Sequence, residues 1–177
     1  LMVKGESRSL KLRKSSHGGF YATGLTQKPV TSLEQVMKHL AKAQSRRRCA
    51  ATKMNDESSR SHLIMTLTLI DKNARGFTSA KLNLVDLAGS ERVAQSGVGG
   101  EELKEAAAIN KSLFYLAQVV GALTKGVKTK AEIPYRNSLL TSLLADSLGG
   151  NCKTTLLACL SPSQTFCAES NQTMKFA

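Results

Sequence analysis

Two polar motifs constrain most strongly what this chain can fold into. The first, residues 55–62 (NDESSRSH), places hydroxyl and amide side chains, an arginine and an imidazole in consecutive positions. It leads directly into residues 63–70, whose alternating apolar side chains would share one face of a β-strand. The second motif, residues 86–91 (DLAGSE), begins with Asp86 directly after the apolar run 82–85. Neither motif is common by chance, and finding both in this order is less so.

The residue types in these motifs suit nucleotide hydrolysis. An aspartate at the end of a strand can hold a water bound to Mg²⁺, and a glycine shortly after it can offer its backbone N–H to a terminal phosphate. Taken singly, a serine-rich loop is usually a turn and such an aspartate is usually a cap. The functional interpretation therefore depends on the two motifs occurring together.

The first motif resembles switch I of kinesin motor domains, and residues 84–92 (LVDLAGSER) resemble kinesin switch II. Further stretches agree in the same order, namely residues 109–113 (INKSL), 133–138 (IPYRNS) and 146–155 (DSLGGNCKTT). The resemblance covers the C-terminal half of such a motor, from about residue 9 to residue 177. It implies an α/β fold, the C-terminal half of a kinesin-type P-loop NTPase motor domain, with a central mixed sheet flanked by helices. We expect residues 1–177 to form a single unit of this partial domain.

The phosphate-cradling P-loop of such motors has no counterpart in residues 1–177, which contain no G-x-x-x-x-G-K-S/T pattern. We therefore expect ATPase activity only if an N-terminal half with a P-loop belongs to the full protein. With that half, the resemblance implies a motor that couples ATP hydrolysis to microtubule binding and movement. The alternative is a non-catalytic, microtubule-binding, kinesin-like fragment that lacks the P-loop.

The resemblance assigns the nucleotide site to four residues. Ser59 would coordinate Mg²⁺ through its hydroxyl, and Ser58 would help to position the attacking water. Asp86 would hold a Mg²⁺-bound water, and the Gly89 N–H would meet the γ-phosphate. These four residues are the expected ATP-binding set, and ATP and Mg²⁺ are the expected ligands.

Two charged residues complete the expected catalytic set. Arg60 and Glu91 match the pair of opposite charges that in kinesins bridges the two switches and closes the site. His62, in contrast, is expected to pack against or order the loop rather than to bind a metal.

The resemblance also implies a microtubule-binding face, formed by a long helix, the loop after it and a shorter helix. The candidate contacts share a basic or aromatic character and are Lys125, Lys128, Lys130, Tyr135 and Arg136. The alternative for the three lysines is a solvated loop. Kinesins commonly carry basic residues where this chain has Leu139 and Ser142, so we expect weaker attachment from those two positions.

The net charge of +12 and the pI near 9.8 predict a polyanionic partner. Nucleic acid, an acidic membrane surface and an acidic protein surface all fit the charge alone. The resemblance favours tubulin in microtubules, and no RNA-binding aromatic pair, zinc-finger spacing or recognition helix supports nucleic acid. Because the chain has no long apolar stretch and no signal-peptide pattern, we expect no membrane insertion and a location in the cytoplasm and cytoskeleton. A dimeric full-length protein is compatible with these observations.

The local patterns predict the following elements. Two strands are expected around a hairpin turn at residues 15–19, and a helix is expected to begin at a capping box from Thr31 to Glu34 and to end at residues 46–48. A long amphipathic helix should carry an apolar stripe of Leu103, Ala106, Ala107, Asn110, Leu113, Ala117, Val120 and Leu123. Beyond it we expect a shorter helix capped by Asn137, a strand over residues 153–160 and a helix from Glu169.

Overall fold

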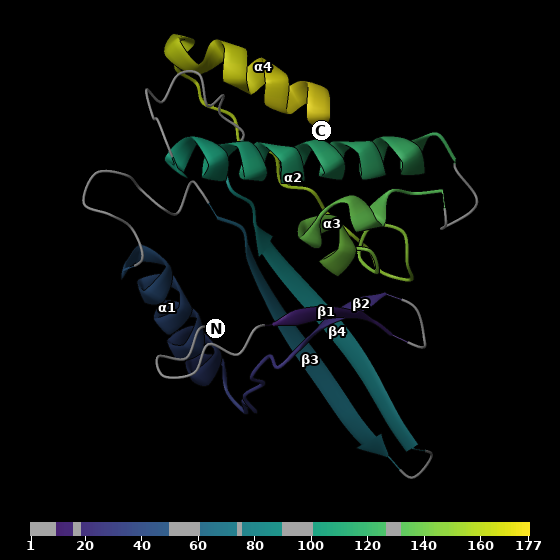
Figure 1. The fold of residues 1–177 in the computed structure, drawn as a ribbon. Coiled ribbons are helices and arrows are strands. Elements are labelled where there is room, and N and C mark those ends of the chain that lie inside the picture. Colours follow the sequence, from purple (N-terminus) through teal and green to yellow (C-terminus); the bar gives the residue numbers. More distant parts are fainter. Residues whose placement is uncertain (1–9, 16–18, 50–60, 74–75, 90–100, 127–131) are drawn as a thin grey trace. The chain divides into compact units, whose positions relative to one another are not determined.

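The computed structural model describes residues 10–15, 19–49, 61–73, 76–89, 101–126 and 132–177 (Figure 1). The chain divides into two compact units. Residues 27–89 form the first unit, and residues 2–26 and 90–177 form the second. Whether residues 1–177 fold as a single domain stays a prediction.

The first unit contains a long antiparallel hairpin of strands β3 (Leu63–Asn73) and β4 (Gly76–Asp86). The register is continuous from the pair Leu63–Asp86 at one end to Asn73–Gly76 at the other. Alternation of apolar and polar side chains favours this pairing, and the opposed residues Thr66 and Asn83 join their side chains at 2.8 Å between Oγ1 and Oδ1. Both expected strands are confirmed, and they are longer than the pattern predicts.

The first unit also contains helix α1 (Leu33–Cys49). The Ser32 hydroxyl accepts the N–H of Gln35 at 3.3 Å, while the Gln35 side-chain oxygen accepts the N–H of Thr31 at 3.0 Å. The expected capping box from Thr31 to Glu34 is therefore wrong by one residue, because serine followed by glutamine three positions later satisfies the free N–H groups of the first turn.

In the second unit, strands β1 (Lys11–Lys14) and β2 (Phe20–Thr23) form the expected hairpin. The N–H of Ser15 donates to the Gly19 carbonyl at 3.1 Å, and Gly19 adopts a φ of 70° that favours glycine. The side chains of Lys11, Arg13 and Lys14 are exposed, as their alternation with an apolar residue predicts.

The core of the second unit lies between helix α2 (Glu101–Thr124) and the short helices η3 (Tyr135–Asn137) and α3 (Leu139–Leu143), which pack against it (Figure 1). Its centre is Val119, which is completely buried, and the cluster around it is Ile133, Tyr135 and Ala145. Over residues 107–124, where burial is described, the most deeply buried side chains of α2 are Leu116 and Val119, neither of which belongs to the expected stripe. The stripe is displaced because the segments after α2 pack on the face that carries Val119.

Helix α3 is capped by Ser138 rather than by the expected Asn137, which is the last residue of η3. Ser138 and Thr141 form a reciprocal capping box: each side-chain oxygen accepts the backbone N–H of the other residue. Thr141 also donates to the Tyr135 carbonyl at 2.8 Å, which ties the helix to η3. The short side chains Ser138 and Thr141 therefore fix the junction between the two helices.

Residues 153–160 are exposed and take part in no strand pairing among the described residues, so the expected strand is wrong for this structure. The sequence pattern is apolar enough for a strand, but a strand needs a neighbour for its backbone N–H and C=O groups. Leu157 is 84% exposed as a result. After this segment, helices η4 (Gln164–Phe166) and α4 (Cys167–Phe176) complete the chain, and α4 begins two residues before the expected Glu169.

Two glycines of the second unit provide a matched test of this packing. An added Cβ at Gly149 would meet the Tyr135 hydroxyl and would lie 2.9 Å from Leu123 Cδ2, whereas a Cβ at Gly121, inside α2, would meet nothing within 4 Å. We expect Gly149→Ala to lower the melting temperature by about 2–12 °C, because overpacking costs about 1–3 kcal/mol. Gly121→Ala should leave it unchanged or raise it by up to about 4 °C. Equal melting temperatures for the two variants would contradict the described packing.

Candidate functional site

The described part of the predicted nucleotide site lies at the end of the hairpin where β3 begins and β4 ends. Leu63 and Asp86 are the last paired residues of the ladder. Just beyond this pair, the backbone N–H of Ala88 donates to Nδ1 of His62 at 3.0 Å. The bond joins the residue that precedes β3 to the loop that follows β4. The expectation that His62 orders a loop is thereby confirmed.

This hydrogen bond defines the state of the imidazole. An Nδ1 that accepts a hydrogen bond carries no proton, so His62 is neutral and its proton is on Nε2. Ala88 is only 5% exposed, and a buried N–H without an acceptor would cost about 1–3 kcal/mol. The imidazole therefore provides a hydrogen-bond acceptor for the Ala88 N–H, which lies beyond the last strand pair.

Two of the predicted site residues lie at this same end of the hairpin. Asp86 is the last residue of β4 and is exposed, and Gly89 follows in the loop and is half-buried. Ser58, Ser59, Arg60 and Glu91 lie outside the described residues. The structure thus places Asp86 and Gly89 at the same end of the hairpin as His62, and the roles of all six predicted catalytic residues stay predictions.

The described donors fit the Mg²⁺ chemistry that the sequence predicts. Mg²⁺ usually keeps several waters and takes one or two carboxylates together with substrate phosphates. A single exposed carboxylate at Asp86 suits contact through water, and no cluster of three acidic, histidine or cysteine side chains occurs within the described ranges. A tight, all-protein metal cage is not what the described residues offer.

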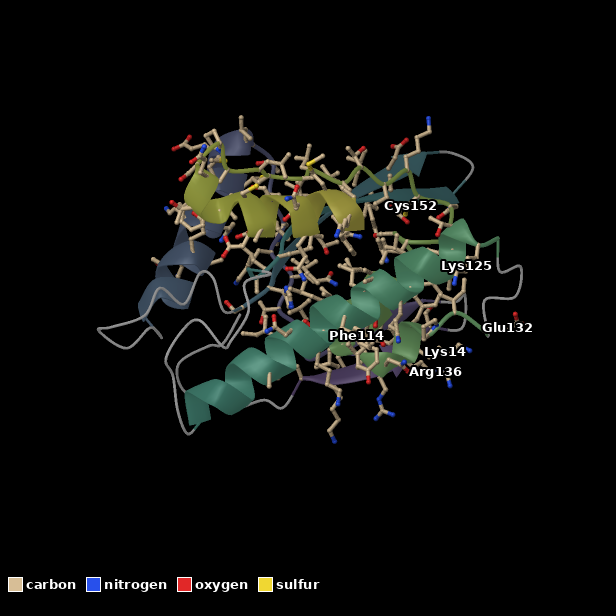
Figure 2. The ribbon with its side chains drawn as sticks, turned by 90° about the horizontal axis from the view of Figure 1, so that it is seen from above. Lys14, Phe114, Lys125, Glu132, Arg136 and Cys152 are labelled. Carbon is tan, nitrogen blue, oxygen red and sulfur yellow. The ribbon has the colours of Figure 1, made fainter. Side chains whose placement is uncertain are left out.

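The predicted microtubule-binding residues are divided between the surface and the core. Lys125, in the turn after α2, and Arg136, in η3, are exposed (Figure 2). Lys128 and Lys130 lie outside the described residues. Tyr135 is only 7% exposed, and its hydroxyl donates to the Leu148 carbonyl at 3.2 Å. Tyr135 is therefore a core residue in this structure, contrary to the expectation of a direct surface contact.

The whole chain, residues 1–177, matches the sequence model of the kinesin motor domain. The chain belongs to this family. It is 44% identical to kinesin-like protein KIN-12D of Arabidopsis thaliana over 99% of its own length and 6% of that protein, and 43% identical to human kinesin-like protein KIF13A over 98% and 10%. The chain therefore spans only a small part of these curated relatives.

Solved kinesin structures agree with the fold. A fast kinesin matches with a TM-score of 0.81 and 44% identity over 94% of this chain and 47% of that one. KIF14 with ADP in complex with a microtubule matches with a TM-score of 0.84 and 38% identity over 99% and 52%. The chain thus corresponds to about half of a solved kinesin motor domain, and this confirms the predicted family and the partial α/β motor fold.

The structure adds the exposure of several side chains, which the sequence alone does not give. Phe114 on α2 is exposed and projects from the ribbon (Figure 2), and Lys111 Nζ lies 6.0 Å from the ring centre of the adjacent Tyr115. Leu139 is 70% exposed, whereas Ser142 is 3% exposed and donates from Oγ to the Tyr135 carbonyl at 2.9 Å. The two positions where kinesins commonly carry basic residues therefore differ: one is on the surface and the other is in the core. In the sequence, only the three-residue spacing of Leu139 and Ser142 on a short helix could have indicated this difference in exposure.

Within the described residues, no helix is both long enough and apolar enough to cross a membrane.

Burial and, secondly, the Asp146 carboxylate raise the pKa of the Tyr135 hydroxyl above its ordinary value of 10.0. A raised pKa means that the unfolded state releases this proton first as the pH rises. The stabilisation is complete below the ordinary tyrosine pKa and is lost as the pH rises through the folded-state value.

We expect the melting temperature to fall between neutral pH and about pH 11, and to fall less in Tyr135→Phe than in the parent. At neutral pH, Tyr135→Phe should cost about 1 kcal/mol, because it removes the hydrogen bond to Leu148. Thermal melts over this range measure both effects. Tyr21→Phe, at an exposed position of β2, is the matched control. An identical alkaline loss in Tyr135→Phe and the parent would refute the assignment.

Proposed function

We propose that this chain provides the two nucleotide switches and the microtubule-binding face of an ATP-driven microtubule motor. The observation that carries the proposal is the hydrogen bond between His62 and Ala88 at the end of the β3–β4 ladder. It holds the end of the first motif against the beginning of the second, which is the arrangement that a site sensitive to the γ-phosphate requires. The microtubule-bound KIF14 structures, one with ADP and one with AMP-PNP, support the same function for the family.

In the proposed mechanism, the Gly89 N–H would donate to the γ-phosphate of ATP, and Asp86 would hold a water of the Mg²⁺ ion. Ser59 would be a direct ligand of Mg²⁺, and Ser58 would orient the attacking water. A bound Mg²⁺ would neutralise part of the negative charge of the phosphates. Once the γ-phosphate leaves, the Gly89 N–H loses its acceptor, so the loop after β4 is free to rearrange.

A movement of the loop after β4 would be transmitted to the proposed microtubule-binding face along the covalent chain. Residues 90–100 connect Gly89 to α2, and α2 ends next to the exposed Lys125. Helix η3 packs against α2, and its residue Arg136 adds a second exposed positive charge. We infer that Lys125 and Arg136, together with Lys128 and Lys130, contact the acidic surface of tubulin. The proposal places the full-length protein on the cytoskeleton.

The pair of Arg60 and Glu91 provides the test of switch closure in the full-length protein. Glu91→Ala should leave ATP affinity within about threefold of the parent and lower kcat at least about 100-fold, because closure stabilises the transition state and not the bound nucleotide. The charge swap Arg60→Glu with Glu91→Arg should restore part of kcat. The measurements are microtubule-stimulated phosphate release and binding of a fluorescent ATP analogue.

Glu34→Gln, in the first turn of α1, is the control for a lost negative charge. Parental turnover in Glu91→Ala would contradict the role of the pair. Microtubule binding by a full-length parent that hydrolyses no ATP would favour the alternative function, a non-catalytic microtubule-binding protein.

Salt dependence tests the microtubule-binding face. Attraction between exposed charges is screened over about 8 Å at physiological ionic strength, so affinity for microtubules should fall steeply as salt increases. Leu139→Lys should tighten binding about two- to fivefold at low salt, because this exposed position would gain a positive charge. Ser142→Arg is unsuitable for the same test, since it would replace a buried side chain that bonds to Tyr135.

Co-sedimentation of the full-length protein with microtubules at two salt concentrations measures this effect. Met174→Lys adds the same charge at an exposed position of α4 and should change the affinity little. Equal binding by the parent and Leu139→Lys, without salt dependence in either, would show that this face does not contact the microtubule.

A further inference from the structure

His62 joins two segments of the chain that the proposed mechanism requires to act together. Its imidazole is the acceptor for the N–H of Ala88, at 3.0 Å. The bond runs between a side chain at the start of β3 and a backbone group two residues after the end of β4. None of the roles assigned to the switch residues above uses this side chain.

The end of the ladder explains why a side chain is needed at this point. Leu63 pairs with Asp86, and the strand pairing stops there, so the backbone of His62 does not continue the ladder to Leu87. Ala88 lies two residues beyond the last strand pair, so its N–H has no place in the ladder. The imidazole reaches across in place of the missing carbonyl and keeps this N–H paired.

The consequence concerns the next residue, Gly89. The Ala88 amide donates to His62, and Ala88 itself is 5% exposed. The Gly89 N–H lies in the planar peptide unit that follows Ala88, so its direction is set by the rotation about the Cα–C bond of Ala88. Holding the Ala88 amide in a buried position limits this rotation and with it the directions that the Gly89 N–H can take.

We infer that His62 is a positioning residue, which holds the Gly89 N–H in the direction of the γ-phosphate through its bond to Ala88. The inference rests on the proposed function for its catalytic consequence. It rests on the structure alone for the claim that His62 holds the loop. A preorganised donor that is already aimed at the developing charge needs no reorganisation during the reaction, and this is where its rate advantage arises.

The chemistry of the bond selects the test variants. His62→Phe keeps a ring of similar size but has no acceptor, so it should release the Ala88 N–H. His62→Asn carries an amide oxygen close to the position of Nδ1 and should keep the bond. His39 is an exposed histidine of α1, which makes His39→Phe a matched control for replacing histidine by phenylalanine.

The experiment uses the full-length protein and two readouts. The first is the rate of backbone hydrogen exchange at Ala88 without nucleotide, which reports the bond itself. We expect His62→Phe to raise it about tenfold, as the loss of a hydrogen bond worth about 1.4 kcal/mol predicts, while His62→Asn and His39→Phe stay within about threefold of the parent. The second is microtubule-stimulated ATP turnover. His62→Phe should lower kcat about tenfold with KM for ATP within about threefold, and His62→Asn should restore kcat.

The outcomes separate this inference from the proposed function. Unchanged exchange at Ala88 in His62→Phe, or faster exchange with parental kcat, would overturn the positioning role. Failure of His62→Asn to restore kcat would do the same, because a merely structural defect would not depend on the acceptor atom. If the parent hydrolyses no ATP, the proposed function fails, while exchange at Ala88 still decides whether His62 holds the loop.

Discussion

The antiparallel ladder between β3 and β4 is the constraint on which the proposed nucleotide site depends. Its register pairs Leu63 with Asp86, so the residues just before β3 and just after β4 meet at one end of the hairpin. A slip by one residue would turn every side chain of β3 to the other face. The opposed pair of Thr66 and Asn83 supports the observed register, and His62 extends the connection past the last strand pair. The proposed catalytic geometry is therefore a consequence of strand pairing.

In the other unit, the backbone carbonyl of Tyr135 is the acceptor for two side-chain hydroxyls. It accepts hydrogen bonds from Thr141 Oγ1 at 2.8 Å and from Ser142 Oγ at 2.9 Å, while the Tyr135 side chain fills the core beside Val119. This arrangement explains in physical terms why a small hydroxyl residue suits position 142 here. The proposed attachment surface would accordingly rely on exposed positive charges, of which Lys125 and Arg136 are the described examples. The proposed binding face would thus be supported by a polar junction as well as an apolar core.

Much of the architecture was predictable from the sequence, and the errors have identifiable causes. Apolar periodicity located α1, α2, β3 and β4, since each is long enough for its pattern to stand out. The caps at Ser32 and Ser138 each differ by one residue from their predicted positions, because adjacent Thr, Ser and Asn residues are nearly equivalent as caps.

Other features depend on tertiary structure and leave little trace in the sequence. The buried stripe of α2 is decided by the segments that pack on it, and residues 153–160 have strand-like composition but no described partner. For the site, the motifs predict roles for Asp86 and Gly89 that stay predictions, and they predict that His62 packs against or orders a loop. The atom that His62 bonds to could not be predicted, since it depends on where the β3–β4 ladder stops.

The central claim is that the end of the β3–β4 hairpin presents a fixed backbone donor to the terminal phosphate of ATP. The most direct measurement is a structure of the full-length protein on microtubules with a non-hydrolysable ATP analogue. The account predicts that the Gly89 N–H lies at hydrogen-bond distance, about 2.7–3.2 Å from donor nitrogen to acceptor oxygen, from the γ-phosphate, with Ala88 still bonded to His62. A nucleotide bound away from this end of the hairpin, or a γ-phosphate without contact to Gly89, would contradict it.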